Sequence, residues 1–133
     1  MSKRAAGLVY FERWLDPVAE TILSRRPEIE LVRLSYGEPL AETDARIRLA
    51  YEYQISPRTE LLGPWFGDRD LLAKCSNLLA ISSSGAGYDM VDVDACTVAG
   101  VIVCSQTGAN AAAVAEHACT RDDARARQKD RSV

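Results

Sequence analysis

Metal-binding and redox-active residues are scarce in this sequence. Its 133 residues contain a single histidine, and its four cysteines form neither a C-x-x-C pair nor a cluster with that histidine. Zinc sites and thiol redox pairs need such groupings, so we expect no metal site and no redox pair. We interpret the cysteines as small buried apolar residues of a protein in a reducing cytoplasm: Cys75, Cys96, Cys104 and Cys119.

Long apolar runs and an excess of positive charge are also absent. The opening segment, MSKRAAGLVYFERW, contains no apolar run of the length found in signal peptides or membrane spans. The formal net charge of −3 provides no basic surface for nucleic acid or anionic lipid. With 47% hydrophobic and 26% charged residues, the composition is typical of a globular domain. We expect one cytoplasmic domain with no nucleic-acid partner and no membrane partner.

Short apolar segments alternate along the chain with segments of helical periodicity. Asp16 and Pro17 are typical of a helix start, and Gly100 is typical of a helix end. Alternating strands and helices predict a parallel sheet with helices on both faces. The expected fold class is α/β, a flavodoxin-like doubly wound parallel sheet of about five strands. The expected strands are 7–11, 29–34, 50–55, 77–82 and 101–105, and the expected helices are 16–26, 40–49, 65–75 and 92–100.

A glycine-rich turn follows the fourth expected strand, within ISSSGAGYDMVD at residues 81–92. Parallel sheets bind ligands outside the carboxyl ends of their strands, which makes this turn and the segment after Val103 candidate sites. The turn falls short of the dinucleotide fingerprint G-x-G-x-x-G, because Met90 stands where the third glycine belongs. The residues MVDVD also separate the turn from the next helix. A dinucleotide-phosphate site is therefore disfavoured here.

Two other functions found in this architecture, a phospho-receiver domain and a flavin-phosphate site, are disfavoured as well. A phospho-receiver domain needs an acidic cluster after the first strand and an Asp after the third. Glu12 follows the first strand, but the third expected strand ends in Gln54-Ile55-Ser56. A flavin-phosphate site needs a loop rich in Ser and Thr after the first strand, where this chain has ERWLDP.

One long segment resembles a known family. Residues 81–118, ISSSGAGYDMVDVDACTVAGVIVCSQTGANAAAVAEHA, resemble part of the N-terminal catalytic domain of the D-isomer-specific 2-hydroxyacid dehydrogenases. The matching features are a G-x-G-x-D turn at 85–89, Val91-Asp92, Gly100-Val101, and Asn110 followed by VAEHA at 114–118. Upstream, residues 7–80 share only the family's order of elements.

The resemblance implies a role for the turn. In the family such a turn holds the carboxylate of the substrate, with backbone N–H groups forming an anion-binding nest. Carried onto this sequence, Gly85 allows close approach, Ala86 and Gly87 donate their N–H groups, and Asn110 offers its side-chain amide. From the residues alone, the glycines can equally form a plain turn, and Asn110 can simply cap the helix that begins at Ala111.

The resemblance also limits what the remaining residues can do. His117 and its neighbour Glu116 do not match the family's catalytic histidine and glutamate, which lie further downstream, so we expect no catalytic residue in this chain. His117 is instead expected to be a packing or interface residue. We predict a substrate-binding domain at 1–118 and a polar, charged tail at 119–133 that is frayed, disordered or a solvated helix.

The family continues after VAEHA with a cofactor domain, whereas this chain turns strongly polar. We therefore interpret it as the substrate-binding part of an NAD(P)-dependent D-2-hydroxyacid dehydrogenase, truncated or frame-shifted and inactive alone. In full-length members of the family the cofactor would be NAD or NADP. We expect neither to bind tightly to this chain. The expected partner is a small 2-hydroxy or 2-keto acid. The face on which the cofactor domain would dock is then exposed, so we expect the chain to be marginally stable or to self-associate, for example as a homodimer. The alternative is a non-enzymatic small-carboxylate binding or interaction module.

Overall fold

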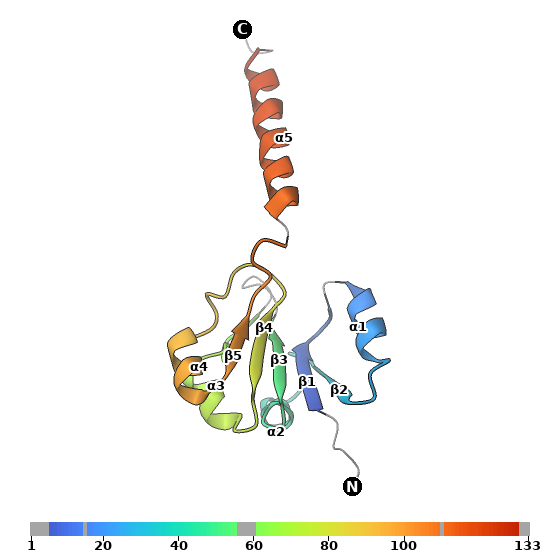
Figure 1. Ribbon diagram of the computed structural model, residues 1–133, viewed down its shortest axis with the longest axis vertical. Helices are drawn as coiled ribbons and strands as arrows, with labels where there is room; N and C mark the ends of the chain where they lie inside the picture. Colours follow the sequence, from blue (N-terminus) through green and yellow to red (C-terminus); the bar gives the residue numbers. More distant parts are fainter. Residues whose placement is uncertain (1–5, 15, 56–60, 110, 131–133) are drawn as a thin grey trace.

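A computed structural model describes residues 6–14, 16–55, 61–109 and 111–130, the last nine of these by their backbone only. Five strands alternate with five helices along the chain (Figure 1). The strands are β1 Ala6–Phe11, β2 Ile29–Leu34, β3 Glu52–Ile55, β4 Ala80–Ser83 and β5 Ile102–Cys104. The helices are α1 Pro17–Leu23, α2 Leu40–Ile47, α3 Arg69–Lys74, α4 Val93–Ala99 and α5 Ala111–Asp130.

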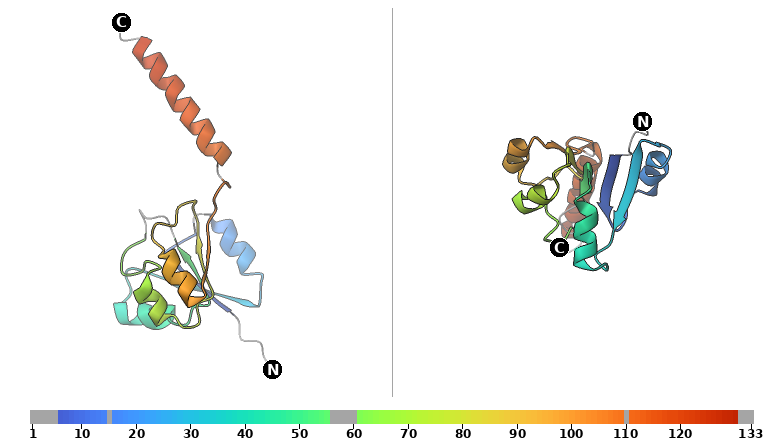
Figure 2. Two further views of the ribbon diagram at one scale, coloured as in Figure 1. Left: turned by 60° about the vertical axis from the view of Figure 1, so that its left-hand side comes forward. Right: turned by 90° about the horizontal axis from the view of Figure 1, so that it is seen from below.

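All strand pairs are parallel, and the sheet order is β2-β1-β3-β4-β5. This order confirms the doubly wound, flavodoxin-like α/β fold. The helices α2, α3 and α4 cover one face, and α1 lies against β1 and β2 on the other (Figures 1 and 2). Since every strand runs the same way, the carboxyl ends of all five meet at one edge.

The core lies between the sheet and α2, α3 and α4. Alternate residues of the central strands, among them Val9, Tyr53 and Ile81, are fully or almost fully buried there with Ile47 of α2 and Cys96 of α4. On the opposite face, α1 buries none of its own residues. The face beneath α2, α3 and α4 therefore carries most of the apolar burial that stabilises the fold.

Capping residues set several of the helix boundaries. The carboxylate of Asp16 accepts a hydrogen bond from the N–H of Val18 at 2.9 Å, and α1 begins at the next residue, Pro17. Gly100 has a φ of 72° and ends α4 in the left-handed conformation that favours glycine. Both signals were readable in the sequence.

Helix α3 begins later than the sequence predicts. It was expected from residue 65 but runs from Arg69 to Lys74, because the side chain of Asp68 caps the N–H groups of Asp70 and Leu71. Trp65 is buried in the preceding loop instead, where its carbonyl accepts a hydrogen bond from the hydroxyl of Tyr53 at 2.9 Å.

Two of the four cysteines also differ from expectation. Cys75 and Cys96 are buried, but Cys104 and Cys119 are exposed. Cys104 lies on β5, on the sheet face that α4 does not cover, and Cys119 lies on α5. Their apolar character alone could not indicate which face each one occupies.

Helix α5 extends away from the sheet (Figure 1). Its described side chains, at 111–121, are all exposed. The predicted tail at 119–133 continues this helix as far as Asp130, and residues 131–133 lie outside the described residues. Among the residues described, no helix combines the length and apolar character that a membrane crossing requires.

Candidate anion-binding turn

A single serine side chain fixes the turn after β4. The hydroxyl of Ser83 donates to the carbonyl oxygen of Gly87 at 2.8 Å and accepts from the N–H of Gly85 at 3.3 Å. The side chain thereby spans the turn from within, replacing the backbone bond that would otherwise close it. Ser83 is buried and both bonds are part-buried, so water competes with them only in part.

The segment after β5 lies against this turn. The N–H of Gln106 donates to the carbonyl oxygen of Gly85 at 3.0 Å. The two segments that the sequence marked as candidates, one after β4 and one after Val103, are thus joined at the carboxyl edge of the sheet. Asn110, the predicted side-chain donor, lies outside the described residues.

Two carbonyls of the turn accept hydrogen bonds, and two of its N–H groups have no acceptor among the described residues. The carbonyls of Gly85 and Gly87 are both occupied, whereas the N–H groups of Ala86 and Gly87 donate no hydrogen bond within the described part of the chain. Ala86 and Gly87 are exposed. Among the described residues, the turn therefore offers two exposed N–H groups without a partner, the kind of donor that an anion-binding nest uses.

Neither glycine of the turn is required by its backbone conformation. The described glycines with positive φ are Gly100 and Gly108, not Gly85 or Gly87. A Cβ placed on Gly85 would lie 4.0 Å from the backbone nitrogen of Gly87 and would clash with none of the described residues. It would, however, fill space beside that unpaired N–H. The glycine thus keeps access to the donor open, consistent with the need for close approach.

The backbone beyond the turn does not enter a helix directly. Met90 is buried in the core, Val91 pairs with Gly67 in an isolated parallel bridge, and α4 starts only after its cap, Asp92. The carboxylate of Asp92 accepts from the N–H of Ala95 at 2.8 Å. A pyrophosphate site needs the helix N-terminus immediately after the turn, so this geometry does not fit one.

Gly67 is a supporting residue that the sequence reasoning missed. Its N–H donates to the carbonyl of Met90 and its carbonyl accepts from the N–H of Asp92, both at 2.9 Å. A Cβ at this position would lie 2.9 Å from Cδ1 of Ile81. The glycine lets the loop before α3 pack directly on β4 and hold the far side of the turn. Its one sequence signal is its place immediately before the helix cap Asp68.

Glu12 holds a second position on the same edge of the sheet. It follows β1 with a φ of 58°, unusual for a residue other than glycine. Its carboxylate accepts from the N–H of Tyr36 at 2.7 Å and from the hydroxyl of Ser35 at 2.8 Å. These bonds, with nearby Arg33, hold the pKa of Glu12 below its usual value. Glu12 thus ties the loop after β1 to the loop after β2.

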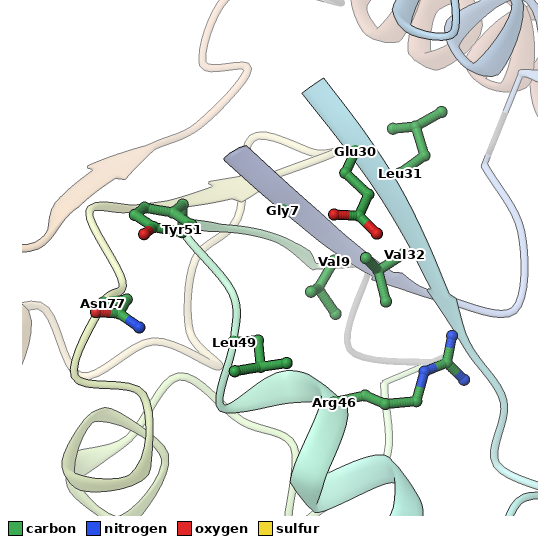
Figure 3. A pocket seen from close by; sticks show the side chains of 9 residues that line it. All are labelled: Gly7, Val9, Glu30, Leu31, Val32, Arg46, Leu49, Tyr51 and Asn77. Carbon is green, nitrogen blue, oxygen red and sulfur yellow. The ribbon is translucent and has the colours of Figure 1, made fainter. Parts of the chain in front are cut away.

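A cavity of about 310 Å³ lies at the opposite, amino-terminal edge of the sheet (Figure 3). Gly7, Val9 and Val32 line it from β1 and β2, and Leu49 and Tyr51 line it from the segment after α2. It contains no residue of the turn, so this cavity is separate from the candidate site. The described residues hold no group of three or more His, Cys, Asp or Glu side chains placed to ligate a metal.

Comparison with known proteins agrees with the fold. Residues 60–131, more than half of the chain, match the family model described as D-isomer specific 2-hydroxyacid dehydrogenase, catalytic domain. By its fold, the chain is an α/β domain whose parallel sheet has the strand order 2-1-3-4-5, with a glycine-rich turn at the carboxyl edge of that sheet. This chain belongs to the D-isomer specific 2-hydroxyacid dehydrogenase catalytic-domain family.

Two curated relatives match part of the chain. It is 43% identical over 53 residues to an (S)-sulfolactate dehydrogenase of Chromohalobacter salexigens, covering 40% of this chain and 17% of the relative. It is 38% identical over 69 residues to a D-3-phosphoglycerate dehydrogenase of Archaeoglobus fulgidus, covering 50% of this chain and 13% of the relative. The chain thus matches less than a fifth of the length of either relative.

A solved structure shares the fold. An NAD-dependent formate dehydrogenase from Staphylococcus aureus, in complex with NAD, superposes with a TM-score of 0.65 at 23% identity. The superposition covers 86% of this chain and 37% of that one.

Proposed function

We propose that the turn after β4 binds the carboxylate of a small 2-hydroxy or 2-keto acid, as the substrate-binding part of an NAD(P)-dependent D-2-hydroxyacid dehydrogenase. The observation that supports this most is the pair of adjacent N–H groups that the turn leaves without a hydrogen-bond partner among the described residues. The N–H groups of Ala86 and Gly87 are unpaired within the described part of the chain, while the carbonyls of Gly85 and Gly87 are occupied.

The chemistry of the turn suits a small carboxylate. Two adjacent N–H groups can each donate to a carboxylate oxygen, and hydrogen bonds to a charged acceptor are stronger than those to a neutral one. The occupied carbonyls cannot turn toward the anion and repel it. Asn110 remains the proposed side-chain donor. Because the donors are few and exposed, we expect affinities no tighter than about millimolar.

The cofactor of the family does not fit this turn. A dinucleotide pyrophosphate is held by a glycine-rich turn that leads directly into a helix, and here Met90 is buried and Val91 lies in a bridge before α4 begins. The described residues therefore bind and orient an acid in this proposal, and no step is assigned to them in hydride transfer.

A binding module without chemistry is the second candidate. The observation that favours it is the kind of group that would hold the acid: the backbone N–H groups of Ala86 and Gly87, with the hydroxyls of Ser83 and Ser84 beside them. None of these exchanges a proton readily near neutral pH, so they can hold a carboxylate without taking part in catalysis. Turnover with a nicotinamide cofactor separates the two candidates.

The binding test follows backbone amides by NMR. The ¹⁵N-labelled chain is titrated with pyruvate and, as a matched neutral ligand, with methyl pyruvate. We expect saturable shifts of the Ala86 and Gly87 amides with pyruvate alone, and we expect Ala86→Pro, which deletes one donor, to weaken the response at Gly87. Equal responses to acid and ester, or shifts confined to other regions, would show that the turn is not the carboxylate site.

A further inference from the structure

The three consecutive serines before the turn have different surroundings. Ser82 lies 2.6 Å from Oε1 of Gln54 and 3.1 Å from Oε1 of Glu52, both on the neighbouring strand β3. Ser83 closes the turn. The hydroxyl oxygen of Ser84 has no exposed surface and no hydrogen-bond partner in the described part of the chain. A buried hydroxyl without a partner is unfavourable, and native structures rarely keep one.

The backbone of Ser84 is fixed on both sides. Its N–H donates to the carbonyl of Ile55 at 3.2 Å, which extends the pairing of β3 and β4 by one residue. The next residue, Gly85, is held by Ser83 and Gln106. Because side chains alternate along a strand, Ser84 points to the same side as Ser82 and away from the core helices. The hydroxyl cannot find a partner through backbone movement without breaking these bonds.

Ser84 is also two residues from the first unpaired donor of the turn, Ala86. The residue as a whole is partly exposed although its oxygen is covered. A change of χ1 between staggered positions therefore moves the hydroxyl without disturbing the backbone, and such a change is fast. Unlike a backbone N–H, a hydroxyl can both donate and accept, so it can bond either to a carboxylate or to the hydroxyl or keto oxygen on the second carbon of the acid.

We infer that Ser84 is a positioning and specificity residue of this site, whose hydroxyl donates a third hydrogen bond to the bound 2-hydroxy or 2-keto acid. The inference rests on the proposed function of the turn. It gives the Ser84 hydroxyl, which has no partner among the described residues, a partner in the ligand-bound state. With Ser84 added to Ala86 and Gly87, the site offers three donors from four consecutive residues.

The experiment compares Ser84→Ala with Ser82→Ala in the full 133-residue chain. Pyruvate affinity is measured from the Ala86 and Gly87 amide shifts, and stability from thermal unfolding without ligand. For Ser84→Ala we expect the pyruvate affinity to be about tenfold weaker, because one hydrogen bond to a charged group is lost. We expect the midpoint of thermal unfolding to be unchanged or higher. For Ser82→Ala we expect the reverse, a lower midpoint with affinity within about twofold of the original. Ser84→Thr keeps the hydroxyl and should restore most of the affinity. If Ser84→Ala folds poorly, Ser84→Cys replaces it in the comparison, because it retains a similar side-chain shape.

The outcomes separate the two proposals. If pyruvate shifts the amides of the unaltered chain but Ser84→Ala, or Ser84→Cys in its place, binds equally well, the role of Ser84 is wrong while the turn stands. A lower unfolding midpoint with unchanged affinity assigns Ser84 a structural role and overturns the inference. If pyruvate shifts neither amide in the unaltered chain, the turn is not a carboxylate site and both proposals fall.

Discussion

The backbone N–H of Gln106 donates to the carbonyl oxygen of Gly85 across 3.0 Å, joining the segment after β5 to the turn after β4. This bond and the two bonds of Ser83 hold the turn in place before any ligand arrives. A preformed site avoids the entropy loss of ordering a loop on binding. We therefore expect the exposed turn to bind a small anion without prior ordering of the loop.

The first prediction concerns access to the unpaired N–H of Gly87. In Gly85→Ala the new Cβ lies 4.0 Å from that nitrogen, so it should obstruct a carboxylate without disturbing the fold. We expect pyruvate affinity to fall about tenfold or more, with the free energy of unfolding unchanged or raised by up to about 1 kcal/mol. Gly37→Ala is the control, since its Cβ would meet only Oγ of Ser35 at 3.7 Å. Unchanged affinity in Gly85→Ala would contradict an anion site at this turn.

The second prediction concerns the support behind the turn. In Gly67→Ala the new Cβ would lie 2.9 Å from Cδ1 of Ile81, which is fully buried and has little room to move. Overpacking of this kind typically destabilises a protein by about 1–3 kcal/mol. Urea unfolding should show that loss in Gly67→Ala, with little change in Gly37→Ala. A loss below about 0.5 kcal/mol would mean that Ile81 repacks freely.

Local signals in the sequence predicted much of the fold. The signals Asp16-Pro17, and Asp92 with Gly100, act through neighbouring residues only, and they place the start of α1 and both ends of α4 correctly. Helix α1 ends at Leu23, earlier than the expected Arg26. The start of α3 could not be placed in this way. Trp65 reads as part of an amphipathic helix, but its position is decided by burial and by the hydroxyl of Tyr53, twelve residues earlier in the chain.

In the candidate site, too, some features could be predicted from local sequence signals and others depend on contacts in the folded chain. The sequence indicated where the turn lies, because a glycine-rich stretch after a strand must reach the carboxyl edge of a parallel sheet. It could not distinguish Ser82, Ser83 and Ser84, which are chemically identical and differ only in what β3 and the turn place beside them. The close packing of Gly67 against Ile81 likewise exists only in the folded chain.

A third prediction follows from the lowered pKa of Glu12, caused mainly by the N–H of Tyr36 and the hydroxyl of Ser35. A carboxyl whose folded pKa is depressed adds stability that is complete above its unfolded pKa, about 4.3, and is lost as pH falls through the folded pKa. The free energy of unfolding should therefore decrease on acidification below about pH 5. Glu12→Gln should flatten this decrease, and a control substitution at exposed Glu42 should not. Equal acid sensitivity in both variants would rule out Glu12 as its source.

The fourth prediction concerns thiol reactivity. Burial raises the pKa of Cys75 to about 11 and also raises the pKa of Cys96, whereas Cys104 and Cys119 are exposed. Because the thiolate is the reactive form, a disulfide reagent at pH about 8 should modify two thiols quickly in the folded chain and the other two only after unfolding. Mass spectrometry of the partly modified protein should locate the fast sites at Cys104 and Cys119. Early modification of Cys75 would contradict its burial.

The last prediction is that the 133-residue chain does not catalyse hydride transfer by itself. The reaction needs a nicotinamide in contact with the substrate carbon and a group that exchanges a proton there. The turn supplies hydrogen-bond donors, its backbone does not fit a pyrophosphate, and the single histidine, His117, is exposed on α5, which extends away from the sheet (Figure 1). We expect no NADH oxidation above background with glyoxylate, pyruvate or hydroxypyruvate, and calorimetric titrations with NAD and NADP should detect no binding tighter than about millimolar. Robust turnover, or cofactor affinity near micromolar, would show that this chain contains a cofactor site, and His117→Asn would then test whether the histidine is its proton donor.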